Sequence, residues 1–118
     1  MKDNHSVGAD YEKKAAEYLK GLGYEILMQN FRCKTGEIDL VARDGKYLVF
    51  VEVKYRANGK MGSPQEAVDW RKQKKICKTA AYYCMREKIP DTQPCRFDVA
   101  ACMGERWTLI RDAFSYIC

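Results

Sequence analysis

The chain has 118 residues, of which 47% are hydrophobic and 31% charged, and its formal net charge is +5. These values are typical of a globular protein, and the length predicts a single domain spanning residues 1–118. No apolar run is long enough to predict a membrane span, and the first ten residues lack the apolar core of a secretory signal. We therefore expect a cytoplasmic protein that has no membrane partner.

The cysteines bear on the redox compartment. The six are Cys33, Cys77, Cys84, Cys95, Cys102 and Cys118. They form no C-x-x-C pair and share no metal-ligand spacing with His5, the single histidine. Thiols stay reduced in the cytoplasm, so we expect free and mostly buried cysteines, with a disulfide framework as the alternative.

The first half of the chain predicts one helix and three strands. Residues 11–22 form the expected helix, whose apolar stripe is Ala15, Ala16, Leu19 and Leu22. Alternating residues at 24–31 indicate a strand. Two stronger strands, 37–42 and 47–54, flank Asp44-Gly45, a strong hairpin signal.

The second half predicts a long helix and two more strands. Ser63-Pro64-Gln65-Glu66 supplies a capping residue, a proline and a glutamate that favour a helix start, and the helix should run to about Lys88. Strands are expected near 95–102 and 107–111. The order α-β-β-β-α-β-β predicts an α/β fold with a mixed β-sheet flanked by helices.

The hairpin predicts which side chains share a face of the sheet. If the loop is Asp44-Gly45, Asp39 pairs with Phe50, and Glu37 pairs with Glu52. One face then carries Glu37, Asp39, Val41, Leu48, Phe50, Glu52 and Lys54. The other carries Ile38, Leu40, Ala42, Val49, Val51 and Val53, which is wholly apolar and must belong to the core.

Three carboxylates and one ammonium therefore gather on the first face. Carboxylates that face one another repel, and burial strengthens the repulsion. Lys54 offsets one negative charge, and a hard divalent cation such as Mg²⁺ would offset the rest. The spacing alone leaves this metal site and a solvent-exposed salt-bridge cluster equally open.

Glu12 points to the same place. It lies three, four and seven residues before Ala15, Ala16 and Leu19, and therefore on the inward stripe of its helix. An acid in the first turn also favours the helix dipole, which is the alternative reading. A site shared with the acidic sheet face explains an inward acid better.

A basic strip marks the second long helix. Arg71, Lys72, Lys74, Lys75 and Lys78 fall within eight residues that contain no acid. Clustered basic side chains supply the sequence-independent part of nucleic-acid affinity, but they also form ordinary solvated helix faces. The strip alone does not separate these readings.

The string "TGEIDLVARDGKYLVFVEVKYR" resembles the signature of the PD-(D/E)XK nuclease superfamily, an aspartate on one strand and Glu-x-Lys on the next. Within it the chain is similar to the bacterial YraN-like family. That likeness covers Glu12 in the first helix, "GYEILMQNFR", "RFDV" at 96–99 and "DAF" at 112–114. The order of the motif residues is also similar to that of archaeal Holliday-junction resolvases. The resemblance implies a restriction-endonuclease-like fold.

The resemblance also implies roles for the motif residues. Asp39 and Glu52 would bind Mg²⁺ or Mn²⁺ together with Glu12, Lys54 would complete the catalytic set, and Glu37 would support the metal ligands. The expected nucleic-acid contacts are Tyr55, Arg56, Lys60, Arg71, Lys72, Lys74, Lys75 and Lys78. We expect an endonuclease that hydrolyses DNA phosphodiester bonds, with structured or branched DNA as a candidate substrate. The alternative is a nucleic-acid-binding module that does not cut, and the oligomeric state stays open, a dimer included.

Overall fold

The computed structural model describes the backbone of residues 4–56 and 69–115 and the side chains of residues 10–56 and 69–115. Its elements are α1 (Asn4–Gly21), β1 (Glu25–Cys33), β2 (Gly36–Asp44), β3 (Tyr47–Arg56), α2 (Trp70–Arg86), β4 (Cys95–Met103) and β5 (Arg106–Ile110). The expected order α-β-β-β-α-β-β is confirmed. No helix in this part of the chain is long and apolar enough to cross a bilayer.

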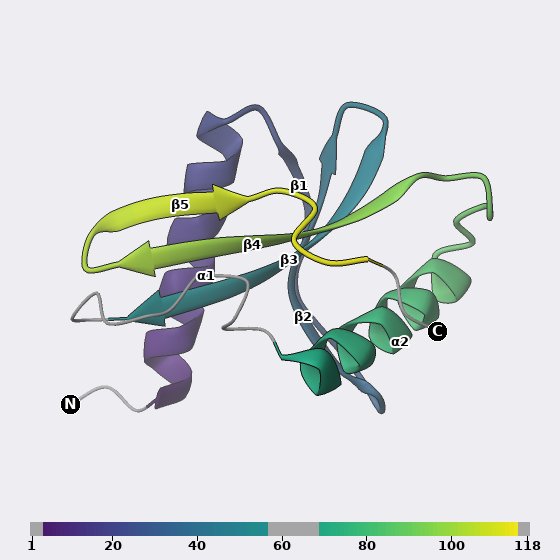
Figure 1. Ribbon diagram of the computed structural model, residues 1–118, viewed down its shortest axis with the longest axis horizontal. Helices are drawn as coiled ribbons and strands as arrows, with labels where there is room; N and C mark the ends of the chain where they lie inside the picture. Colours follow the sequence, from purple (N-terminus) through teal and green to yellow (C-terminus); the bar gives the residue numbers. More distant parts are fainter. Residues whose placement is uncertain (1–3, 57–68, 116–118) are drawn as a thin grey trace.

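The five strands form one mixed sheet in the order β1-β2-β3-β4-β5. Neighbouring strands are antiparallel except β3 and β4, which are parallel and are connected through α2. The two helices lie on opposite faces of the sheet (Figure 1). The prediction of an α/β fold with a helix-flanked mixed sheet is confirmed.

Each helix covers its own hydrophobic core. On the α1 face, the buried residues are Ala15, Ala16, Leu19, Tyr24, Leu40, Ala42, Val49, Val51 and Ala100. On the α2 face they include Phe31, Ile38, Val41, Leu48, Phe50, Ile76, Cys77, Ala80, Tyr83, Phe97 and Val99. The sheet face that was expected to carry the acids is therefore also core over most of its length.

The hairpin register differs from the expected one. Asp44 pairs with Tyr47, so the loop is Gly45-Lys46 rather than Asp44-Gly45. Gly45 has φ +58° at the first loop position, where a type II′ turn needs a positive φ. Every partner is displaced by two residues, and because side chains alternate with a period of two, the faces of β2 and β3 near the turn stay as expected.

Ile38 is the exception to that alternation. It packs in the α2-side core with Phe31, whereas the sequence placed it on the opposite face with Leu40. The left-handed backbone of Asn30 (φ +58°), between the Gln29–Leu40 and Phe31–Ile38 pairs, interrupts the pleat at this point. The side chains of both β1 and β2 therefore change faces at this point, which on β2 is Asp39.

The start of α2 also differs from the expectation. The expected capping segment 63–66 lies outside the described residues, and the helix begins at Trp70. Asp69 is its N-cap, with an extended backbone and a carboxylate that accepts the N–H of Lys72 at 2.9 Å. In contrast, α1 starts earlier than expected, at Asn4.

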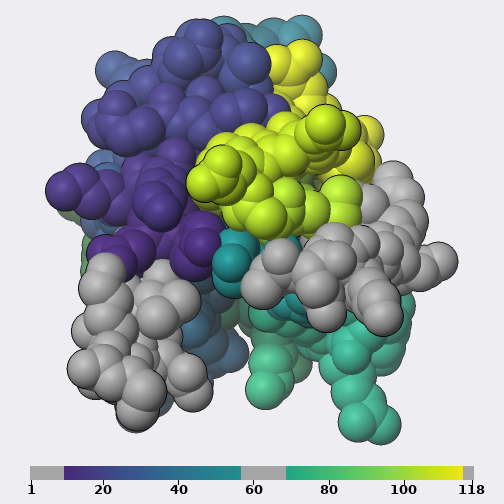
Figure 2. Space-filling view, turned by 90° about the vertical axis from the view of Figure 1, so that its left-hand side faces the viewer, coloured from purple at the N-terminus to yellow at the C-terminus, as the bar shows by residue number. Residues whose placement is uncertain are grey.

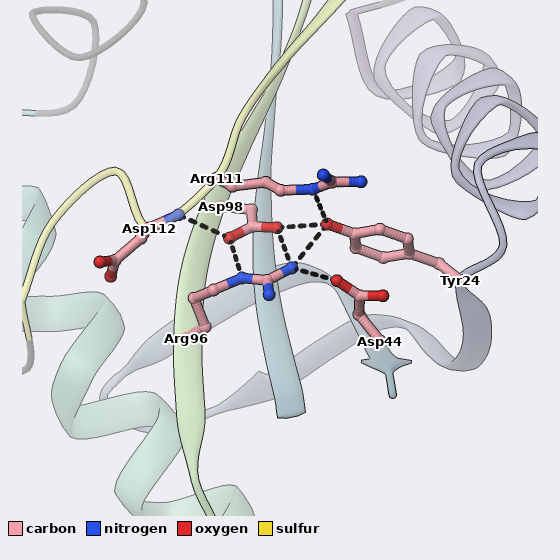
Figure 3. Close-up of polar contacts among 6 residues, drawn as sticks. All are labelled: Tyr24, Asp44, Arg96, Asp98, Arg111 and Asp112. Carbon is pink, nitrogen blue, oxygen red and sulfur yellow. Dashed lines mark hydrogen bonds and ion pairs between the residues drawn. The ribbon is translucent and has the colours of Figure 1, made fainter. Parts of the chain in front are cut away.

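The "RFDV" and "DAF" motifs meet in one buried polar network (Figure 3). Asp98, which is 0% exposed, accepts from Arg96 Nε and Nη2 at 2.9 and 3.0 Å. Its two oxygens also accept the hydroxyl of Tyr24 at 2.8 Å and the backbone N–H of Asp112 at 2.9 Å. Arg96 reaches Asp44 at 2.8 Å, so the network fastens β4 to the β2–β3 hairpin and to the segment after β5.

The described cysteines are free, as predicted, although fewer of them are buried than expected. Cys77 and Cys102 are buried, Cys33 and Cys84 are partly exposed, and Cys95 is exposed. Cys118 lies outside the described residues.

Candidate active site

Asp39 and Glu52 lie where β2 and β3 separate. The pairing of these strands ends at Leu40 and Val51, and beyond it β2 turns away from β3 (Figure 1). Asp39 Oδ2 accepts the backbone N–H of Val53 at 2.8 Å, which gives that donor a partner after the strands part. The separation leaves the Asp39 carboxylate beside Glu52 rather than inside a continuous ladder.

Asp39 is held in an environment that disfavours its negative charge. Burial, followed by the charges of Glu52 and Glu12, raises the pKa of Asp39 to about 8, against the opposing effects of the Val53 N–H and Lys72. A carboxyl group with such a pKa either holds a proton near neutral pH or needs another cation close by. This is the electrostatic condition under which a bound divalent cation stabilises a site.

Glu52, the neighbour of Asp39, has two lysines as cationic partners. It is 8% exposed, and its Oε1 forms ion pairs with Lys54 Nζ at 3.5 Å and, more closely, with Lys72 Nζ. Lys54 comes from β3 itself, whereas Lys72 reaches over from α2. Two ammonium groups therefore share one carboxylate oxygen.

The pKa values of the two lysines are shifted in opposite directions. Burial and the neighbouring Lys72 lower the pKa of Lys54, although Glu52 acts against this. Burial also acts to lower the pKa of Lys72, but Glu52, Lys54 and Asp39 together act against it, and the pKa of Lys72 is raised. Lys72 is thus the firmer counter-ion of Glu52, and Lys54 is the lysine whose proton is more easily lost.

Lys72 belongs to the site, although the sequence placed it with the outer basic strip. The signal was present, because Lys72 lies four, seven and eleven residues before Ile76, Thr79 and Tyr83, which are all buried. Extending the inward stripe of α2 by one turn reaches Lys72, by the argument that placed Glu12 inward.

Glu12 and Glu37 have different positions. Glu12 is partly buried on α1, and its charge raises the pKa of Asp39, which places it at the cluster. Glu37 pairs with Arg32 across β1 and β2 at 3.2 Å and is more than half exposed, at 56%. The change of face at Asp39 takes Glu37 away from the cluster, so the structure does not bring Glu37 to Asp39 and Glu52, and its expected supporting role stays a prediction.

The expected nucleic-acid contacts lie in different parts of the chain, on α2 and at the end of β3. Arg71, Lys75 and Lys78 are exposed on α2, and Lys74 Nζ lies 5.0 Å from the centre of the Trp70 ring. At the end of β3, Arg56 is exposed and Tyr55 partly exposed, and Lys60 lies outside the described residues. The exposed members leave α2 a basic outer face next to the cluster.

The cluster offers the ligand type that Mg²⁺ and Mn²⁺ prefer, carboxylate oxygens. Among the described residues, no three His, Cys, Asp or Glu side chains already stand together as a metal-binding group. Lys72 forms the closer of the two ion pairs with Glu52. Its side chain is 42% exposed, so its ammonium group can move away from Glu52 into solvent. The fit of a divalent cation to Asp39 and Glu52 therefore depends on displacing an ammonium group.

Comparison with known proteins places every residue of this cluster in a matched region. The model of UPF0102, an uncharacterised protein family, matches residues 11–102. A UPF0102 protein of Lachnoclostridium phytofermentans is 50% identical over 107 residues, which cover 91% of each chain. One from Clostridium botulinum strain Loch Maree is 50% identical over 96 residues, 81% of this chain and 78% of the relative. The chain belongs to the UPF0102 family.

Proposed function

We propose that the protein is a metal-dependent endonuclease that hydrolyses DNA phosphodiester bonds, on a fold of the PD-(D/E)XK type. The observation that carries this proposal is the pair of carboxyl groups, Asp39 and Glu52, brought together where β2 and β3 separate, with two lysines against them. An acidic pair with a lysine two positions after the second acid is the arrangement that the sequence resemblance implies.

Asp39 and Glu52 would hold Mg²⁺ or Mn²⁺, with Glu12 as the third carboxylate. When bound, such a cation lowers the pKa of a coordinated water and stabilises negative charge on the scissile phosphate. Binding of a divalent cation also removes the repulsion that raises the pKa of Asp39, which is a reason for these carboxyl groups to accept one.

The lysines would act on the phosphate. Lys54 is 14% exposed and 3.5 Å from Glu52, so its ammonium is fixed beside the metal ligands and can stabilise charge that develops on the phosphate oxygens. Lys72 neutralises Glu52 in the resting molecule and is exposed enough to turn toward a phosphate. The exposed basic residues Arg71, Lys75 and Lys78 would bind the DNA backbone beyond the reacting bond.

A second candidate function is a nucleic-acid-binding module that does not cut. The observation that favours it is that Glu52 already has two cationic partners, so the cluster is close to neutral without a metal ion. In that case the basic face of α2 would bind the phosphate backbone, and the acids would only hold the lysines in place.

Incubation with plasmid, single-stranded and four-way-junction DNA in Mg²⁺, Mn²⁺ or EDTA tests the proposal. We expect cleavage with a divalent cation, none with EDTA, and none with Asp39→Asn. Glu17→Gln is the matched control, because Glu17 is an exposed carboxylate on α1 that pairs with Lys20, and this variant should cut like the wild type. DNA binding by every variant without metal-dependent cleavage by the wild type would favour the binding module.

A further inference from the structure

A pocket of about 520 Å³ lies between the last turns of α2 and the start of β4. Two thiols line it, Cys84 from α2 and Cys95 from β4. The rest of its wall is largely apolar and includes Phe50, Ala80, Met85 and Ile89. The volume is within the range of roughly 300–1,000 Å³ that is typical of small-molecule sites. The pocket therefore offers room for a small molecule beside two sulfur atoms.

The backbone around both cysteines is held by hydrogen bonds. At the end of α2, the carbonyl of Cys84 accepts the N–H of Ile89 at 2.8 Å. Directly before Cys95, the carbonyl of Pro94 accepts the N–H of Leu48 at 3.0 Å, which fixes the start of β4 against β3. The two thiols therefore come from separate elements whose positions are set, and the fold brings them to one pocket.

The two thiols interact directly, and the interaction makes them chemically different. Hydrogen bonding to Cys95, followed by burial, raises the pKa of Cys84. The same contact lowers the pKa of Cys95 to about 7, although burial acts against it. A thiol that donates to a neighbouring thiolate produces this pair of effects. Cys95, the more exposed of the two, is therefore the thiol that readily becomes a thiolate, and Cys84 is the donor that stabilises it.

This pair is separate from the candidate active site. Cys84 lies twelve residues after Lys72 on α2, a rise of about 18 Å along the helix axis. Figure 2 looks onto the end of the molecule at which α2 begins (green, at the bottom), and Figure 1 shows α2 running away from that end. DNA cleavage at the cluster would not use these thiols, so their role is independent of the proposed function.

We propose that Cys84 and Cys95 form a dithiol site that exchanges reversibly with a low-molecular-weight disulfide. In the first step, the Cys95 thiolate attacks one sulfur of the small disulfide, whose S–S bond breaks, and one small thiolate leaves. A mixed disulfide on Cys95 remains, and the pocket has room for its small-molecule half.

The second step joins the two cysteines. In the mixed disulfide Cys95 is no longer a thiolate that accepts from Cys84, so the main cause of the raised pKa of Cys84 is removed. Cys84 then passes its proton to the first small thiolate, attacks the Cys95 sulfur and expels the second small thiolate. Two protein thiols are oxidised to one disulfide between α2 and β4, and the small disulfide is reduced to two small thiols.

Peptide mapping after exposure to oxidised glutathione tests this inference in the full chain. Trypsin cuts after Arg86 and Lys88, so Cys84 and Cys95 lie on different peptides that only a disulfide joins. We expect the wild type, in EDTA near neutral pH, to yield the joined peptide and to lose it after addition of dithiothreitol. Before oxidation, Cys95 should react with iodoacetamide about tenfold faster than Cys84.

Serine variants separate the two steps. Cys84→Ser should stop at the mixed disulfide, so the peptide that carries Cys95 should keep one glutathione. Cys95→Ser removes the attacking thiolate, and Cys84 should stay reduced in most molecules. Cys33→Ser is the matched control, because Cys33 is a partly exposed thiol that contacts the hydroxyl of Thr35 at 3.1 Å instead. This variant should form the joined peptide like the wild type.

The wild type in urea supplies a comparison that needs no variant to fold. The unfolded chain has the same cysteines without the pocket or the lowered pKa of Cys95, so the joined peptide should form several-fold more slowly there. Folded wild type whose Cys84 and Cys95 peptides stay separate would overturn the site. So would a joined peptide that forms equally fast in urea. Neither result bears on DNA cleavage, which the assay with Mg²⁺, Mn²⁺ or EDTA decides by itself.

Discussion

The ammonium of Lys72 on α2 pairs with Oε1 of Glu52 on β3, the same oxygen that Lys54 approaches at 3.5 Å. A cation that binds Glu52 must therefore compete with Lys72. We expect Lys72→Met to tighten Mn²⁺ binding roughly fivefold, the equivalent of about 1 kcal/mol, which is near the upper value for a partly exposed ion pair. Isothermal titration calorimetry with Mn²⁺ measures this directly.

Lys75→Met is the matched control for that experiment. Lys75 is exposed one turn further along α2, and its loss should leave Mn²⁺ affinity unchanged. If Lys72 also contacts the phosphate, Lys72→Met should lower the cleavage rate despite its tighter metal binding. Equal Mn²⁺ affinity of the two variants would show that Lys72 does not compete for Glu52.

Removing the two acids should have opposite effects on the stability of the metal-free protein. Asp39→Asn removes a disfavoured charge and keeps an oxygen for the Val53 N–H, so we expect the free energy of unfolding to rise by about 1 kcal/mol. Glu52→Gln leaves Lys54 and Lys72 facing each other without a counter-ion and should lower it by about 1 to 3 kcal/mol.

Urea unfolding in EDTA, repeated with Mn²⁺, measures both changes. Added Mn²⁺ should stabilise the wild type and neither variant. If both variants are destabilised in EDTA and Mn²⁺ does not stabilise the wild type, the cluster is a structural salt-bridge network.

The stability difference between wild type and Asp39→Asn should depend on pH. The pKa of Asp39 is raised to about 8 in the folded protein, against about 3.9 for an ordinary aspartate. The folded state then binds more protons than the unfolded state between these values, so wild-type stability falls as pH rises from about 4 to about 8. Asp39→Asn lacks this loss, and its advantage should grow across that window and level off above it.

Thermal melts in EDTA at several pH values from 4 to 9 test this sign. The comparison is made within each pH, so that other titrating groups, which the two proteins share, cancel. An advantage that shrinks with rising pH would mean that Asp39 is stabilised as a carboxylate, contrary to its surroundings.

The Asp98 network should control stability rather than metal binding. Asp98 is fully buried and accepts two hydrogen bonds from Arg96, whose side chain is 12% exposed. Asp98→Asn therefore leaves this mostly buried guanidinium with Asp44 as its one ionic partner among the described residues. We expect a loss of about 3 to 5 kcal/mol in the free energy of unfolding. Mn²⁺ affinity, measured below the melting temperature, should stay close to that of the wild type.

Asp112→Asn is the control for this variant. Asp112 contributes its backbone N–H to Asp98, while its own carboxylate points away from the network (Figure 3). Asparagine also tolerates the left-handed backbone at this position, φ +53°, so stability should change by less than about 0.5 kcal/mol. A large loss in Asp112→Asn would show that the side chain matters as well.

Local sequence patterns were enough to predict the elements and their order. Alternation of apolar residues in 47–54 and the helical stripe of Ala15, Ala16 and Leu19 depend only on which face of one element is apolar, and burial followed those faces. The same rule predicted that Glu52 and Lys54 lie on one side of β3. Even the error in the hairpin loop was harmless near the turn, because a displacement of two residues preserves the face.

The positions of several side chains depended on tertiary contacts that local sequence patterns do not specify. The interruption of the pleat at Asn30 and Asp39 depends on the pairing of β1 with β2. It places Ile38 on the α2 side of the sheet and Glu37 beside Arg32. Lys72 meets Glu52 only because the crossover between β3 and β4 lays the first turn of α2 over the end of β3. The sequence by itself determined the sheet, the helices and the acidic pair with its lysine. The packing of α2 onto that sheet decided which cation faces Glu52, because contacts between distant segments depend on chain topology and not on the periodicity of either segment.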